Sequence, residues 1–188
     1  MRSRLRTLSA GSLLPEAKTD AEKAFAAKAA EDLNDFAKDA FKGGFVRLAR
    51  EVWSEVLFDY DPDDADARKA LGFKKVGSSW GPDSTCSYPN DDAGDARKGR
   101  SLQSSWDKRA KKLGEGHLDL ADELDAANEA ARAKYHRGRA LRFIAGDKKL
   151  AKRAASDDRK GEYGSEIQLA IRERSERIDK AMAEAQST

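Results

Sequence analysis

Apolar residues recur along this chain at intervals of three and four positions, the spacing that places side chains on one face of an α-helix. The first such stretch follows Thr19-Asp20-Ala21-Glu22, a capping box in which hydroxyl and carboxylate accept hydrogen bonds from backbone donors of the first turn. We predict a helix over 20–42 that ends at Gly43-Gly44, because glycine adopts left-handed backbone angles readily. The stripe of this helix comprises Phe25, Leu33, Phe36, Ala37, Ala40 and Phe41.

A second apolar stripe predicts a helix over 45–59 that forms a hairpin with the first. Asp61-Pro62 should then start a short helix over 63–71, since proline suits the first helical position and Asp61 can act as its N-cap. Gly72 ends this helix, and residues 73–80 can form a small β-hairpin. The second stripe comprises Leu48, Ala49, Val52, Trp53, Val56 and Leu57.

The second half of the chain predicts a comparable set of helices, in which Leu102 and Trp106 anchor the first. We expect Gly114-Glu115-Gly116 to break that first helix, and the next two to form a second hairpin. The fold class is therefore all-α, with helical hairpins in two halves and the small β-hairpin at 73–80. The four predicted helices cover residues 98–113, 117–127, 128–145 and 147–155.

Composition along the chain suggests how these helices are grouped. Residues 81–97 are rich in Gly, Pro, Asp and Ser and are predicted to be a linker or long loop between two helical units. The last segment has isoleucines among dense charges of alternating sign, which favours a solvated helix or one half of a loose coiled coil. The predicted divisions are a disordered N-terminus (1–18), a first unit (19–80), the linker (81–97), a second unit (98–159) and a C-terminal helix (160–188).

The two predicted hairpins share one pattern at a separation of 84 residues. Small residues at helix-crossing points, with larger apolar residues one turn away, are what a packed helical hairpin needs. The crossing alanines Ala37 and Ala49 thereby correspond to Ala121 and Ala133. The corresponding residues of the first copy are Phe36, Ala37, Ala40, Ala49, Trp53, Val56 and Leu57, and those of the second are Leu120, Ala121, Leu124, Ala133, Arg137, Ala140 and Leu141.

This grid resembles the tetratricopeptide repeat in its large–small pair, its alanines, its aromatic residue four positions later and its Asp-Pro end. The segment Ala70-Leu71-Gly72-Phe73, followed by Trp80, is similar to the end of such units in some large bacterial proteins. There, helical regions of this type can precede a protease-like or membrane-anchored domain. The second copy departs from the pattern, with Arg137 in place of the aromatic residue. The resemblance implies a scaffold that binds a partner without naming it.

Composition excludes several classes of protein. The 36 basic and 34 acidic residues nearly cancel, and the single cysteine, Cys86, rules out an intrachain disulfide and a multi-cysteine metal site. No apolar run is long enough for a membrane span. The basic start, Met1 to Arg6, is followed by an apolar run broken by polar residues, so we expect an uncleaved, cytoplasmic protein. A degenerate export signal or an organelle-type presequence is the alternative.

Candidate chemistry is sparse. The acidic run from Asp59 to Asp66 lacks the glycine and glutamate of an EF-hand, so helix capping explains it better than calcium. His117, beside Asp119, has no nucleophile to activate. His117 and His136 could share a metal with Asp122 or Glu123, but zinc sites usually need three or four ligands, and a packing role is favoured. We predict no catalytic, cofactor-binding or metal-binding residues and cannot assign binding residues.

The expected function is therefore a non-catalytic helical scaffold, without a cofactor, that binds a protein or peptide. The first alternative is a nucleic-acid-associated module that uses the basic residues of 98–153, provided that these cations gather on one face and escape neutralisation. The second is the helical region of a larger hydrolase-type protein that lacks its catalytic domain.

Overall fold

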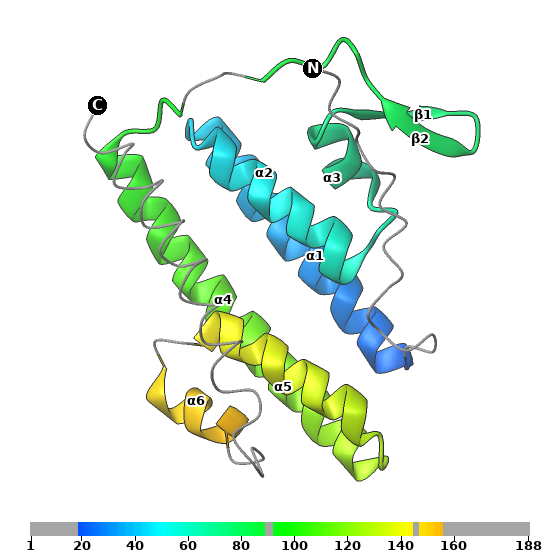
Figure 1. The fold of residues 1–188 in the computed structure, drawn as a ribbon. Coiled ribbons are helices and arrows are strands. Elements are labelled where there is room, and N and C mark those ends of the chain that lie inside the picture. Colours follow the sequence, from blue (N-terminus) through cyan, green and yellow to red (C-terminus); the bar gives the residue numbers. More distant parts are fainter. Residues whose placement is uncertain (1–18, 89–91, 145–146, 156–188) are drawn as a thin grey trace, which may run out of the picture.

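The computed structural model of the protein describes residues 19–88, 92–144 and 147–155 and is predominantly helical. In this part of the chain the helices are accompanied by one antiparallel two-stranded β-hairpin (Figure 1), which confirms the predicted fold class. The elements are α1 (Asp20–Lys42), α2 (Val46–Glu55), the π-helical turn η1 (Val56–Tyr60), α3 (Ala65–Ala70), β1 (Phe73–Val76), β2 (Ser79–Pro82), α4 (Ala96–Ala126), α5 (Ala130–Ile144) and α6 (Lys148–Ala155).

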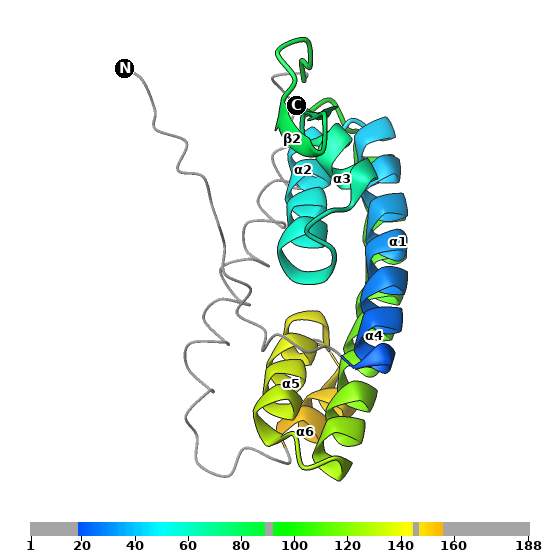
Figure 2. The same ribbon diagram turned by 90° about the vertical axis from the view of Figure 1, so that its right-hand side faces the viewer.

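The helices form two layers. Helices α1 and α4 lie side by side in one layer, and α2 and α5 lie one after the other in the second layer (Figure 2). Helix α2 packs on α1, α5 packs on the second half of α4, and α6 packs beside α5. The end of α2 is thereby directed toward α5, so that the two hairpins meet near the middle of the molecule.

Both predicted helical hairpins are present, with alanines at their crossing points. In the first hairpin, Ala37, Ala49 and Val56 have no exposed surface. Their counterparts 84 residues later, Ala121, Ala133 and Ala140, are equally buried. Side chains of this size let two helix backbones approach closely, which is why alanine recurs at these positions.

The predicted break at Gly114-Glu115-Gly116 is wrong, because α4 continues through it. A Cβ atom at Gly114 would lie 2.1 Å from Cγ2 of Ile144, and one at Gly116 would lie 2.4 Å from the ring of Phe25. These glycines therefore allow α5 and α1 to approach the backbone of α4. Their role is close packing, and the helix tolerates their lower propensity.

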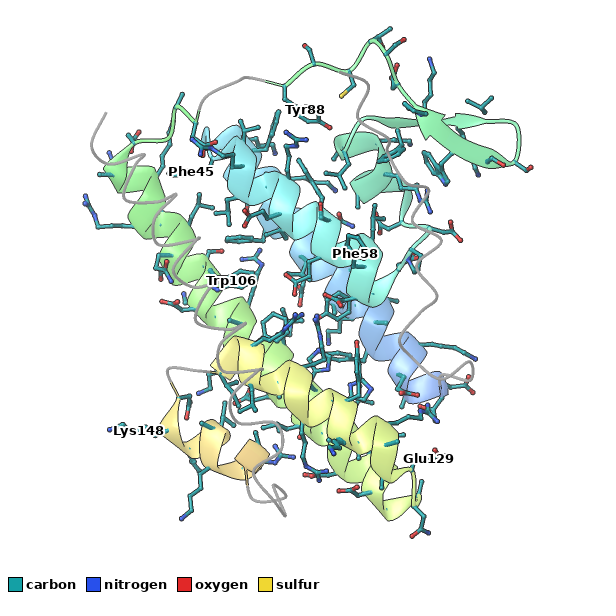
Figure 3. All side chains as sticks on the ribbon, in the orientation of Figure 1. Phe45, Phe58, Tyr88, Trp106, Glu129 and Lys148 are labelled. Atoms are coloured by element: carbon teal, nitrogen blue, oxygen red, sulfur yellow. The ribbon has the colours of Figure 1, made fainter. Side chains whose placement is uncertain are left out.

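The main hydrophobic core contains residues from both predicted units. Trp106 of α4, labelled in Figure 3, lies 5.1 Å from the ring of Phe36 in α1 and 6.3 Å from that of Phe143 in α5, measured between ring centroids. The predicted linker is also packed near its end, since the backbone N–H of Ala93 donates to the carbonyl of Gly44. The two units 19–80 and 98–159 thus share buried apolar surface.

The second predicted helix is regular only as far as Glu55 and then widens into η1. The wider turn leaves Phe58 63% exposed and buries Tyr60, which is 4% exposed. The predicted cap at Asp61 is wrong, because α3 begins at Ala65 and Asp64 accepts the hydrogen bond from the N–H of Ala67 at 2.7 Å. This irregular segment turns Tyr60 toward the junction of the two hairpins.

Two predicted segments, the N-terminus 1–18 and the C-terminal helix within 160–188, lie outside the described residues. Within residues 19–88, 92–144 and 147–155, no helix is both long enough and apolar enough to cross a membrane.

Candidate functional site

Four polar side chains meet in the interior where the two hairpins join. Glu22 comes from α1, Tyr60 from η1, His117 from α4 and His136 from α5, and each is at most 5% exposed. We call this set the buried polar chain. It combines one residue from each of four elements, so that its geometry depends on how both hairpins are placed.

Hydrogen bonds connect these four side chains in sequence. The distance from Tyr60 Oη to His117 Nε2 is 3.2 Å, that from His117 Nδ1 to His136 Nδ1 is 2.9 Å, and that from His136 Nε2 to Glu22 Oε1 is 3.1 Å. One direction of donation satisfies all three contacts. The Tyr60 hydroxyl donates to His117, the Nδ1–H of His117 donates to His136, and the Nε2–H of His136 donates to the Glu22 carboxylate.

The pKa values of two members agree with this direction. Burial, followed by the positive charge of Arg139, holds the pKa of His117 well below its ordinary value, so this ring is neutral near pH 7. Burial also raises the pKa of the Tyr60 hydroxyl, which therefore remains a donor. A neutral His117 can accept at Nε2 while it donates from Nδ1.

Glu22 has a second role at the start of α1. Its Oε2 accepts from the backbone N–H of Thr19 at 2.6 Å, which completes the predicted capping box. The same carboxylate forms a buried ion pair with Arg132 of α5. One carboxylate thus caps α1 and attaches its first turn to α5, and a capping box alone needs no such burial.

A buried ionic cluster lies beside the polar chain. Arg139 of α5, which is 5% exposed, pairs with Glu55 at 3.3 Å and with Asp59 at 2.8 Å. Its guanidinium carbon lies 5.6 Å from the ring centroid of Tyr60. These contacts fasten the end of the α2–η1 segment to α5, and they account for the charges that the interior contains here.

A small cavity adjoins the polar chain. The cavity volume open to a water molecule is about 20 Å³, which is enough for about one water and too little for an organic substrate. The described residues that line it are Glu22, Phe25, Ala26, Asp59, Tyr60, His117, Tyr135 and His136. The arrangement can relay or hold a proton, but it offers no room for a reacting molecule.

The structure brings the two histidines together, but their carboxylate partner is not one of the nearby acids that the sequence suggested. Asp119 and Asp122 lie at the surface and form ion pairs with Arg153. The carboxylate that reaches the histidines is Glu22, more than ninety positions before His117. In the part of the chain that the structure describes, no three His, Cys, Asp or Glu side chains are grouped so that they could hold a metal ion.

Sequence reasoning missed Glu22 and Tyr60 as members of this site. Glu22 lies four residues before Ala26 and seven before Ala29, on the buried stripe of α1, which is a detectable sign of a buried carboxylate. Tyr60 carries no such sign, because the π-helical turn changes the face on which it lies.

The acidic run from 59 to 66 is used within the fold. Asp59 pairs with Arg139, Asp63 with Arg68, and Asp66 with Lys38, while Asp64 caps α3. This agrees with the capping interpretation.

Comparison with known proteins adds no relative. No family model, no curated protein and no solved structure matches this chain. Its function is therefore inferred from its own geometry.

Proposed function

We propose that this chain is a non-catalytic, tetratricopeptide-like scaffold that binds a protein or peptide, and that the β1–β2 hairpin contributes the contact surface. The supporting observation is that the hairpin exposes an apolar side chain on each of its two faces, Val76 (60% exposed) on one and Phe73 (37% exposed) on the other. Figure 1 shows the hairpin projecting from the helices beyond α3. A short two-stranded hairpin is marginal by itself, so a partner that covers its apolar side chains would stabilise it.

Aromatic and charged groups lie on the Phe73 face of the hairpin. Trp80 lies across the hairpin from Lys75, whose ammonium is 5.9 Å from its ring centroid, and the guanidinium of Arg68 is 5.5 Å from the same centroid. Aromatic and apolar side chains beside arginine are enriched at protein interfaces. The expected partner surface is therefore apolar, with an acidic group placed to meet Lys75.

Interior chemistry supports a scaffold better than an enzyme. The buried titratable groups Glu22, Glu55 and Arg139 contact charged or polar side chains of the protein itself. The adjoining cavity admits about one water molecule. A binding protein needs neither a substrate pocket nor an activated nucleophile.

The experiment is affinity capture of partners with Val76→Asp and its matched control Phe58→Asp, followed by quantitative mass spectrometry. The control replaces a similarly exposed apolar residue on η1, away from the hairpin. We expect Val76→Asp to lower recovery of specific partners at least tenfold, while Phe58→Asp retains them and both variants keep the wild-type circular dichroism. Equal recovery by all three proteins, or equal loss in both variants, would contradict a contact surface on the Val76 face of the hairpin.

The nucleic-acid alternative receives less support from the charges. Several basic residues of 98–153 form ion pairs within the protein, as Lys112 does with Asp32, and Arg137 with Asp125. Paired cations release fewer counterions from a phosphate backbone. Retention on an oligonucleotide that falls steeply between 50 and 200 mM salt would restore this alternative.

A cytoplasmic location is part of the same proposal, and the exposed free thiol of Cys86 is compatible with a reducing compartment. The second alternative, a helical region that serves a hydrolase-type domain on another chain, would be supported by a neighbouring reading frame that encodes such a domain.

A further inference from the structure

The only two histidines of the chain are the two central members of the buried polar chain. Histidine is the side chain whose ordinary pKa places its charge change between pH 5 and 8. The α1–α2–η1 segment supplies Glu22 and Tyr60 to the buried polar chain, and the α4–α5 hairpin supplies both histidines. The groups most sensitive to mild acid therefore join one hairpin to the other.

The contact between the two rings limits how many protons the pair can hold. Nδ1 of His117 and Nδ1 of His136 are 2.9 Å apart, so one must donate and the other must accept. An accepting nitrogen carries no proton. The two rings can thus share at most one positive charge while this hydrogen bond exists, whichever ring carries it.

Side chains from several helices surround His117 and oppose its protonation. Arg139 and Arg142 of α5 place positive charge near it, and the ring of Phe143 stacks on it with ring centroids 5.8 Å apart. Phe25 of α1 contacts it edge-on with ring centroids 4.7 Å apart, and the Tyr60 hydroxyl that η1 presents to it is neutral. A second proton would therefore enter an apolar site that already faces cations.

The other side of the pair is anionic but already neutralised. Glu22 accepts from His136, and its carboxylate also pairs with Arg132. Asp59 and Glu55 of the α2–η1 segment pair with Arg139, and Asp59 also lies 3.7 Å from Arg142. Tyr135 contacts the His136 ring edge-on and brings no charge. The nearby carboxylates are thus engaged with arginines, so little negative charge is left over for a second imidazolium.

We propose that the two histidines form an acid-sensitive latch that joins the two hairpins near neutral pH and opens when the pair takes up its second proton. Opening separates the imidazole rings, releases Glu22 and Tyr60 from the histidines, and exposes Phe25. The middle of α1 remains attached through Phe36 and Trp106, so the first turns of α1 move and the rest of the helix stays in place.

The sign of the pH dependence follows from proton uptake. The opened or unfolded chain binds two protons on its histidines below their ordinary pKa of about 6.5, whereas the closed pair binds at most one. Acid therefore favours the open state. Once the pH is well below 6.5, the ratio of closed to open molecules should fall at least about tenfold for each further pH unit.

The test is amide hydrogen exchange of the full chain at pH 7.5, 6.5 and 5.5, corrected for intrinsic exchange rates. We expect protection of the first three turns of α1 to fall by roughly threefold to thirtyfold between pH 6.5 and 5.5, and protection around Phe36 to stay constant. His117→Phe, which removes one titrating group from an aromatic environment, should abolish this fall. Glu51→Gln, an exposed carboxylate variant on α2, is the matched control and should retain it. A wild-type protein with pH-independent protection in α1, or an identical fall in His117→Phe, would overturn the proposal.

A second measurement remains decisive if His117→Phe does not fold. Nitrogen-15 NMR of the two imidazoles in the wild-type protein should show at least one neutral ring at pH 5.5 in the closed state. Two rings that both become charged near pH 6.5 while exchange protection in α1 is retained would refute the latch.

Discussion

Replacement of Gly114 by alanine tests whether α4 and α5 pack closely because residue 114 has no side chain. Alanine is favoured over glycine inside a helix by about 1 kcal/mol, so an open site would be stabilised. Here the new Cβ would lie 2.1 Å from Cγ2 of Ile144, which is 1% exposed and cannot move into solvent.

The free energy lost through the clash with Ile144 should exceed the free energy gained from the higher helix propensity of alanine. Cγ2 is attached directly to Cβ of a β-branched side chain, so Ile144 cannot avoid the new methyl group by a small rotation. Overpacking of this kind costs typically 1–3 kcal/mol, and a contact this short requires α5 to shift, so we take the upper end. After subtraction of the propensity gain, the expected net loss is about 2 kcal/mol, or a decrease in melting temperature of roughly 4–8 °C.

Urea unfolding of Gly114→Ala, Ile144→Ala and the double variant provides the assay. Ile144→Ala alone should cost roughly 2–5 kcal/mol because it leaves a cavity. The double variant should lose at least 1 kcal/mol less than the sum of the two single losses, since the clashing Cγ2 is gone. A Gly114→Ala protein more stable than the wild type, or strictly additive losses, would show that the close approach of α4 and α5 is not what Gly114 provides.

Three further predictions concern polar side chains. Arg139→Leu should lower the free energy of unfolding by about 3–5 kcal/mol because it leaves Glu55 buried without its cation. Arg153→Leu, the control at a half-exposed ion pair, should lower it by about 1 kcal/mol or less. Similar urea midpoints for both variants would contradict this ranking. Thr19→Ala should cost about 1 kcal/mol through loss of the capping box, and thermal unfolding with no measurable change would count against that cap. Tyr60→Phe should cost about 1 kcal/mol, because it removes the donor to His117 but keeps the ring beside Arg139, and an unchanged calorimetric stability would mean that this hydrogen bond contributes nothing.

Local signals predicted the regular elements closely. The predicted helix 20–42 has the bounds of α1, because a capping box and a glycine pair end the helix through contacts among neighbouring residues. The predicted β-hairpin and both helical hairpins are also present, because they too depend on residues that are close in the sequence. Periodicity is a local property, and it reports which face of a helix must be buried.

Local sequence patterns did not predict the contacts between residues that are distant in the sequence. Gly114 and Gly116 have the composition of a helix break, and only the positions of Ile144 and Phe25 explain why α4 continues through them. The partners of the two histidines were likewise sought among nearby acids, whereas the actual carboxylate comes from the first turn of α1.

By itself the sequence determined the helical class, the extent of α1, the two alanine-lined hairpins and the near balance of charge, because each follows from spacing, capping or composition. The tertiary structure decided that both hairpins share a core, that η1 turns Tyr60 inward, and that Glu22, Tyr60 and the two histidines form one hydrogen-bonded chain. The physical reason is that burial of a polar group requires a partner, and that partner is determined by how whole helices pack, which no local pattern encodes.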